Sequence, residues 1–181
     1  MLIDEGMDTG DILLQREVPI EDEGNSLTLW KRLSEVGAEL LVETVGLIAS
    51  GRAEPVKQDD SLATYAPMLK KEDGMIEWSR PAREIRNRIR GMQPWPGAYT
   101  YWTLKGRKIM LKLLSAKVLP GPSSEPGRVL DAGEKGLIVA AGEGAILVER
   151  LQAEGGRPMS AADFQRGHRL IPGERLGGPG E

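Results

Sequence analysis

The residues best suited to chemistry lie in an acidic loop near the start of the chain, residues 4–11 (DEGMDTGD). Glycine permits a positive φ and a close approach of the backbone to a ligand, and Asp and Thr side chains can hydrogen-bond within their own turn. The pattern predicts a tight loop that carries the carboxylate of Asp8 directly before an apolar strand over residues 12–18. That carboxylate is well placed for chemistry, although the same residues are also typical of a solvated surface turn.

A metal site is the weaker interpretation of this loop. Its acidic spacing departs from the calcium-loop pattern, which requires further acidic positions and a closing Glu at fixed offsets. The chain has no cysteine and a single histidine. This composition excludes disulfides, thiolate ligands, a cysteine nucleophile and a histidine metal cluster within the chain.

The composition favours a globular protein of one or two small domains. The 181 residues are 40% hydrophobic and 28% charged, which is sufficient for a core. No apolar run is long enough to cross a bilayer, and acidic residues stand where a signal peptide would carry basic ones. We therefore expect a cytoplasmic protein.

The net charge of −3 conceals an asymmetry along the chain. Residues 1–69 carry a net charge of −9, and residues 70–181 carry +6. Within the second part, residues 70–120 hold twelve Lys and Arg against four Asp and Glu, a local net charge of +8. A local basic field attracts polyanions even when the whole protein is acidic.

A long amphipathic helix must support the acidic loop. Apolar residues recur at spacings of three and four after Ser26, and either Asn25 or Ser26 can cap the start of this helix, which Gly51 would end. Trp30 lies on the apolar stripe, so we expect it in a core. The polar, proline-containing stretch that follows, residues 51–69, is predicted to be a linker.

A second helix would present arginine side chains. After a short strand over residues 75–78, Ser79 can cap a helix beginning near Arg80, with Pro81 in its first turn. At 100° per residue, three arginines fall on one face and the apolar side chains fall on the other. The arginines are Arg83, Arg86 and Arg90.

Residues 93–97 (QPWPG) then form a turn in which two prolines restrict the backbone around Trp95. We expect Trp95 to be a packing anchor between elements, with nucleotide stacking as the alternative. Short strands are predicted over residues 98–104, 107–116, 127–130, 137–141 and 145–151, and a last helix begins at Ser160. Such closely spaced strands favour a small antiparallel barrel of the OB-like type.

Three segments of the chain resemble one protein family in its order. Residues 4–13 (DEGMDTGDIL) are similar to the Asp-x-Gly-x-Asp-x-Gly signature of the 10-formyltetrahydrofolate-dependent formyltransferases. Residues 93–100 (QPWPGAYT), and the closing segment of residues 159–170 (MSAADFQRGHRL), resemble the carboxy-terminal domain of the methionyl-tRNA formyltransferases. The first two segments are shared with sugar-nucleotide formyltransferases and formyltetrahydrofolate dehydrogenase, and the closing segment favours the tRNA enzymes.

The resemblance implies formyl transfer from 10-formyltetrahydrofolate, as co-substrate and without a metal, to the amino group of methionine on initiator tRNA. The family uses an Asn, a His and an Asp, of which Asp8 matches the Asp, and Gly6 and Gly10 would shape its loop. The sequence contains neither the family's Asn-x-His motif nor its Ser-Leu-Leu-Pro loop. His168 does not match the family's His by motif, and we expect it at the surface at a helix end.

The implied organisation is an amino-terminally truncated enzyme, inactive by itself. Residues 1–50 would be an α/β remnant of the catalytic, Rossmann-like domain, residues 51–69 a linker, and residues 70–181 an OB-like tRNA-binding domain. The cations expected to contact the tRNA backbone are Arg83, Arg86, Arg90, Lys105, Arg107, Lys108 and Lys112.

Two other interpretations of the chain stay open: a non-catalytic RNA-binding module and a fragment of a sugar-nucleotide formyltransferase. We expect no interaction with DNA or membranes, and a monomer when the enzyme is full length.

Overall fold

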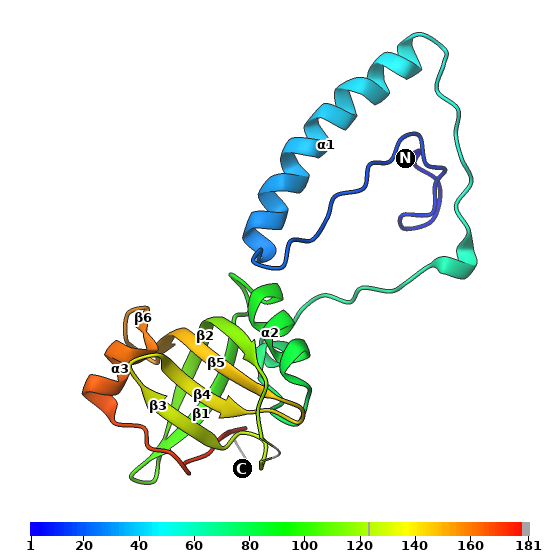
Figure 1. The fold of residues 1–181 in the computed structure, drawn as a ribbon. Coiled ribbons are helices and arrows are strands. Elements are labelled where there is room, and N and C mark those ends of the chain that lie inside the picture. The colour runs from blue at the N-terminus through cyan, green and yellow to red at the C-terminus, as the bar shows by residue number, and fades with distance from the viewer. Residues whose placement is uncertain (123, 179–181) are drawn as a thin grey trace. The chain divides into compact units, whose positions relative to one another are not determined.

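The computed structural model describes residues 1–122 and 124–178, which divide into two units, Met1–Met68 and Leu69–Glu181 (Figure 1). The first unit contains one long helix and extended segments, and the second contains a curled sheet with two helices. In the part of the chain that the structure describes, no helix combines the length and the apolar character that a bilayer span requires.

The helix of the first unit, α1, covers Ser26–Ala49, as predicted. The Asn25 side chain accepts a hydrogen bond from the Thr28 N–H, and the Thr28 hydroxyl accepts one from the Asn25 N–H. Gly51 follows the helix with φ of 67°. None of the helix residues is buried. The prediction that Trp30 belongs to a core is wrong for this chain, because its side chain is 71% exposed.

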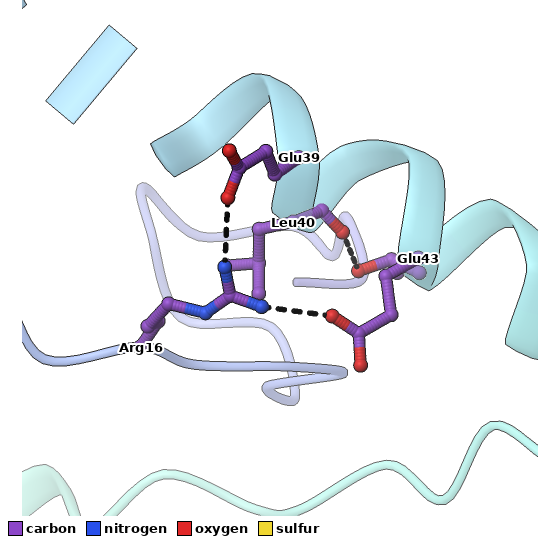
Figure 2. A network of polar contacts seen from close by, with 5 residues as sticks. Arg16, Glu39, Leu40 and Glu43 are labelled. Carbon is purple, nitrogen blue, oxygen red and sulfur yellow. Dashed lines mark hydrogen bonds and ion pairs between the residues drawn. The ribbon is translucent and has the colours of Figure 1, made fainter. Parts of the chain in front are cut away.

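The strand predicted over residues 12–18 does not form. Ile12 makes only an isolated antiparallel bridge with Val56, with both N···O distances at 2.8 Å. Figure 2 shows the Arg16 guanidinium between two carboxylates of α1, 3.2 Å from Glu39 Oε2 and 2.9 Å from Glu43 Oε2. These ion pairs are exposed and contribute less than about 1 kcal/mol each. In place of the predicted strand, this segment therefore has one backbone bridge, from Ile12 to Val56, and two weak ion pairs to α1.

The second unit is built on one antiparallel sheet, in the order β3-β4-β5-β2-β1-β7, with β6 paired to β5. Its strands are β1 Ala98–Leu104, β2 Arg107–Leu119, β3 Val129–Gly133, β4 Gly136–Ala140, β5 Ala145–Ala153, β6 Met159–Ser160 and β7 Leu176–Gly177. The five longer strands confirm the strand predictions to within a few residues. The two short ones, β6 and β7, have no periodic signal in the sequence because each contains only two residues.

The sheet curls until its two edges approach a common segment, residues 173–177. The Leu176 N–H donates to the Gly127 carbonyl before β3, and the Val129 N–H of β3 donates to the Glu174 carbonyl. The same segment continues into β7, whose Leu176 pairs with Trp102 of β1. The barrel-like sheet therefore fits the predicted OB-like fold.

Two helices cover different sides of this sheet: α2 (Ala82–Gly91) and α3 (Ala161–His168), as Figure 1 shows. In α3, Phe164 is fully buried, lies edge-on to Trp102 and stacks on the exposed ring of His168, with 4.3 Å between the last two ring centroids. The predictions of a helix capped by Ser160, and of a surface position for His168 at its end, are confirmed.

The segment before α2 differs from the prediction. Residues 71–74 form a short 3-10 helix, and Met75 makes only an isolated bridge with Tyr99 in place of the strand expected over residues 75–78. Trp78 is buried, and its indole N–H donates to the Thr100 hydroxyl at 3.0 Å. The Ile76 N–H also donates to the Tyr99 carbonyl at 2.8 Å, so one backbone bond and one side-chain bond anchor the segment to β1 before α2.

Candidate functional sites

The arginine face of α2 is the first candidate site. Ile85 and Ile89 are 2% and 1% exposed and belong to the core, which leaves the opposite side of the helix toward solvent. Arg83 is exposed, whereas Arg86 and Arg90 are half-buried. The helix therefore presents three guanidinium groups from one side, as the 3.6-residue period predicted.

The orientation of α2 depends on the turn between β4 and β5. The Ala82 N–H donates to the Glu143 carbonyl at 2.9 Å, and the Gly142 N–H donates to the Arg80 carbonyl at 3.0 Å. The prediction that Ser79 caps the helix is wrong: the N-cap residue is Pro81, which offers no side-chain cap. A backbone carbonyl from a distant turn replaces the cap.

Arg90 Nε donates to Asn87 Oδ1 at 3.0 Å, and two more arginines beside this face also make contacts within the protein. Arg88 Nε donates to the Asp73 carbonyl at 2.8 Å. Arg80 forms ion pairs with Glu77 at 3.0 Å and Glu84 at 3.7 Å, and the hydrogen bond and charge of Glu77, with the charge of Glu84, raise the pKa of its guanidinium. Arg88 is three residues beyond Ile85 and therefore lies beside the apolar side of the helix. Arg86, three residues before Ile89, lies at the opposite edge of that side, so the helical period alone does not separate these two arginines.

The four remaining predicted cations lie along the β1–β2 hairpin. Lys105, Arg107 and Lys108 are exposed at its turn, where Lys105 and Gly106 have positive φ. Lys112 is half-buried and lies opposite Tyr99 in the register of β1 and β2, near the turn that follows α2. Lys112 lies five positions beyond Arg107 on the strand, roughly 17 Å away at 3.4 Å per residue. The seven cations are thus divided between the helix, the middle of β2 and the hairpin turn.

The turn after α2 holds Trp95 in an exposed position. The Gly97 N–H donates to the Met92 carbonyl at 2.8 Å, and the Gln93 side-chain amide donates to the Leu114 carbonyl. The prediction that Trp95 is a packing anchor is wrong, because its side chain is 57% exposed. Backbone and amide contacts fix the turn, and the indole remains largely exposed.

The acidic loop of the first unit is the second candidate site. Asp4 Oδ1 accepts hydrogen bonds from the Gly6 N–H at 3.1 Å and the Thr9 hydroxyl at 2.6 Å. Gly10 is buried, and a methyl group built on it would lie 1.9 Å from the Leu2 carbonyl oxygen. A methyl group on Gly6 would lie 2.1 Å from the Thr9 hydroxyl. Both glycines therefore stand where a side chain would disturb the loop.

Asp8 is exposed and has φ of 58°, in the left-handed region that Asp adopts more readily than most residues. Gln58 contacts the backbone on both sides of Thr9: its amide Nε2 lies 2.9 Å from the Asp8 carbonyl oxygen and 2.7 Å from that of Gly10. Sequence patterns gave no indication of this contact, because the two partners are about fifty positions apart.

The loop and residues 57–66 line an open hollow of about 600 Å³. Its lining includes Asp8, Thr9, Gln58 and Asp59. The Ser61 hydroxyl and backbone N–H donate to Asp59 and lower the pKa of that carboxyl group. Within the described residues, no three acidic or histidine side chains gather in the way that a metal ion requires.

Comparison with known proteins identifies the second unit. Residues 68–169 match the family model described as "Formyl transferase, C-terminal domain". The chain belongs to this formyltransferase family. The matched residues include α2, the β1–β2 hairpin and the exposed Trp95.

Relatives named methionyl-tRNA formyltransferase resemble nearly the whole chain. The relative from Geobacter sulfurreducens is 44% identical over 180 residues, which are 99% of this chain and 55% of the relative. The relative from Solibacter usitatus is 48% identical over 177 residues, which are 98% of this chain and 55% of the relative. This formyltransferase chain therefore spans about half the length of the curated relatives that it matches.

Solved structures of HypX from Aquifex aeolicus share the fold. One variant has a TM-score of 0.62 at 17% identity, covering 91% of this chain and 30% of HypX. HypX in complex with tetrahydrofolic acid has a TM-score of 0.60 at 17% identity, covering 90% of this chain and 28% of HypX. At this identity the likeness concerns the fold of the formyltransferase chain alone.

Proposed function

We propose that the chain provides the tRNA-binding domain, and part of the catalytic domain, of a methionyl-tRNA formyltransferase. The reaction is the transfer of a formyl group from 10-formyltetrahydrofolate to the amino group of methionine on initiator tRNA. The observation that carries the proposal is the 44–48% identity to enzymes of that name over almost the full chain. The tetrahydrofolic acid bound by HypX is consistent with a folate co-substrate.

The proposal gives the Asp8 carboxylate the chemistry of the family's aspartate. The methionine amine attacks the formyl carbonyl, an oxyanion forms, and a proton passes from the amine to the departing folate nitrogen. An ionised carboxylate beside an imidazole favours and orients the imidazolium, and it can hold a proton-relaying water. The family's Asn-x-His motif is not in this sequence, so in this proposal residues 1–50 act as part of a larger Rossmann-like domain, and the chain by itself does not transfer formyl.

The second unit would bind the phosphate backbone of tRNA. The outward arginines of α2 and the hairpin cations provide the positive charge that binds phosphates with little dependence on sequence. The exposed Trp95 adds an indole that can stack on a base. The enzyme would act in the cytoplasm as a monomer, with tRNA as its macromolecular partner in place of DNA or a membrane.

Binding of initiator tRNA to the 181-residue chain, measured by filter binding at several salt concentrations, tests this proposal. The triple variant Arg83→Gln, Arg86→Gln, Arg90→Gln should weaken binding about 10- to 100-fold and reduce the salt dependence, since each phosphate contact contributes about 0.7 to 0.9 to the logarithmic slope. The matched control removes the same charge from exposed positions outside the predicted set: Lys135→Gln, Arg150→Gln and Arg157→Gln.

The control should bind within about threefold of the unmodified chain, because phosphate contacts depend on where the charges lie. Equal losses in the two variants would show that total charge, and not the α2 face, determines binding. An absence of tRNA affinity even at low salt would contradict the proposal and favour a sugar-nucleotide formyltransferase.

A further inference from the structure

The segment predicted as a linker, residues 51–69, contacts the acidic loop at two points. Val56 exchanges both backbone hydrogen bonds with Ile12, immediately after the loop. Two residues later, the Gln58 side chain reaches the carbonyl oxygens of Asp8 and Gly10. The segment therefore forms part of the loop's support.

The geometry of Gln58 suits a fixed role. A glutamine amide has two N–H groups, and here the one nitrogen lies within hydrogen-bond distance of two carbonyl oxygens that flank Thr9. Gln58 is half-buried, and the oxygen that it contacts on Gly10 belongs to a buried residue. Both amide N–H groups of Gln58 donate to backbone oxygens of the loop, so they hold the loop backbone in place. Neither of these two hydrogen bonds involves the Asp8 carboxylate.

The loop requires such support at Asp8. Its positive φ is sparsely populated by residues with a side chain, and such conformations persist where the surroundings determine them. Asp4 supports the loop on both sides of Asp8, through the Gly6 N–H and the Thr9 hydroxyl. Gln58 adds a contact to Asp8 itself, at its carbonyl oxygen, and a second contact at the Gly10 carbonyl oxygen.

We propose that Gln58 is a positioning residue for Asp8, holding the loop backbone in the conformation that directs the Asp8 carboxylate toward the reacting groups. This inference rests on the proposed function. Gln58 acts through Asp8 and does not itself touch the substrate. A small displacement of a reacting group can cost up to about a hundredfold in rate, which sets the scale of the expected effect.

The test uses a chimera in which the complete 181-residue chain replaces the segment that it matches in the Geobacter sulfurreducens relative. Formyl transfer to charged initiator tRNA is measured for variants at both positions. Asp8→Asn should lower kcat by about 10²- to 10⁴-fold. Gln58→Ala should lower kcat by about 10- to 100-fold and leave the KM for tRNA within about twofold.

Two further variants separate positioning from mere stability. Gln58→Glu keeps the size of the side chain but removes the amide donors, so it should lose as much activity as Gln58→Ala. In the Asp8→Asn background, Gln58→Ala should change kcat by less than about twofold, because a residue that acts through Asp8 has nothing left to position. Gln15→Ala, at an exposed glutamine of the same unit, is the matched control and should retain full activity.

The outcomes distinguish this inference from the proposed function. If Asp8→Asn loses activity and Gln58→Ala does not, the inference is overturned and the function stands. If the Gln58→Ala loss is undiminished in the Asp8→Asn background, Gln58 has a structural role only, which also overturns the inference. An inactive chimera, or an active one that tolerates Asp8→Asn, overturns the proposed role of Asp8 and the inference with it.

Discussion

The two units use helices in opposite ways. The 24 residues of α1 include none that is buried, although Asn25 caps the helix through a reciprocal hydrogen-bond pair. The ten residues of α2 include three buried side chains, although no side chain caps it. Local capping therefore determines where a helix begins, whereas burial of a face determines how strongly it is held, and in this chain the two contributions are found in different helices.

Hydrogen exchange of the full chain should give the largest contrast between the units. Amides of β2 and β5, at the centre of the sheet, should exchange at least about a thousandfold more slowly than amides of α1, since isolated helices are marginal and core strands open only with global unfolding. Exchange resolved by NMR measures this directly. Protection of α1 equal to that of β5 would show that the first unit is packed in solution and would remove the contrast.

A pair of tryptophans provides the next contrast. Trp102 is 1% exposed, and its indole N–H donates to Glu174 Oε2 at 3.2 Å. Trp102→Ala should lower the free energy of unfolding of the second unit by about 3 to 5 kcal/mol, measured by urea titration of its methyl NMR signals. Trp30→Ala, at a side chain that is 71% exposed, is the control and should change this free energy of unfolding by less than about 0.5 kcal/mol. A comparable loss for Trp30→Ala would show that α1 is packed.

Two threonines test polar contacts in the same way. The fully buried Thr100 hydroxyl accepts from the Trp78 indole and donates to the Gly177 carbonyl at 3.2 Å. Thr100→Val should cost about 1 to 3 kcal/mol of unfolding free energy, because it leaves buried partners unsatisfied. Thr44→Val in α1 removes a hydroxyl that bonds only to Leu40 of its own helix, and urea titration should show little change. A neutral Thr100→Val would mean that water replaces the hydroxyl.

The smallest effect concerns stability at alkaline pH. Burial, with the negative charges of Tyr101 and Glu72, raises the pKa of Tyr99 above its ordinary value of 10.0. Above pH 10 the phenol ionises first in the unfolded chain, so its stabilising contribution is complete below pH 10 and declines as pH rises toward the folded-state pKa. Tyr99→Phe should reduce this alkaline loss in urea titrations. Tyr65→Phe, at an exposed position of the first unit, is the control and should show the same loss of stability at alkaline pH as the unmodified chain.

The sequence was a good guide where periodicity extends over several residues. The strands from Ala98 to Ala153 and the arginine face of α2 follow from alternation and from the 3.6-residue period. The errors arose where long-range contacts replace local ones. The strand expected after Asp11 needs neighbours that the first unit does not contain, and the cap expected at Ser79 is replaced by the Glu143 carbonyl.

The candidate sites show the same division. The loop around Asp8 was identified from the spacing of its acidic and glycine residues, and its place in catalysis stays a prediction. The contact from Gln58 was not foreseen, because a polar segment rich in Asp and Pro has no pattern that separates a linker from a support. The prediction that Trp95 is a packing anchor between elements is wrong, since flanking prolines predict a fixed backbone but not the direction of the side chain.

The turn at residues 141–144 gives evolution and engineering a remote means of changing the arginine face that we propose as the tRNA interface. A methyl group on Gly142 would lie 1.9 Å from the Ser79 carbonyl oxygen, so substitution there must displace the start of α2. Such a change would tilt the whole arginine face while every cation kept its identity. Substitutions in this short turn would therefore change the orientation of the arginine face without altering its charge.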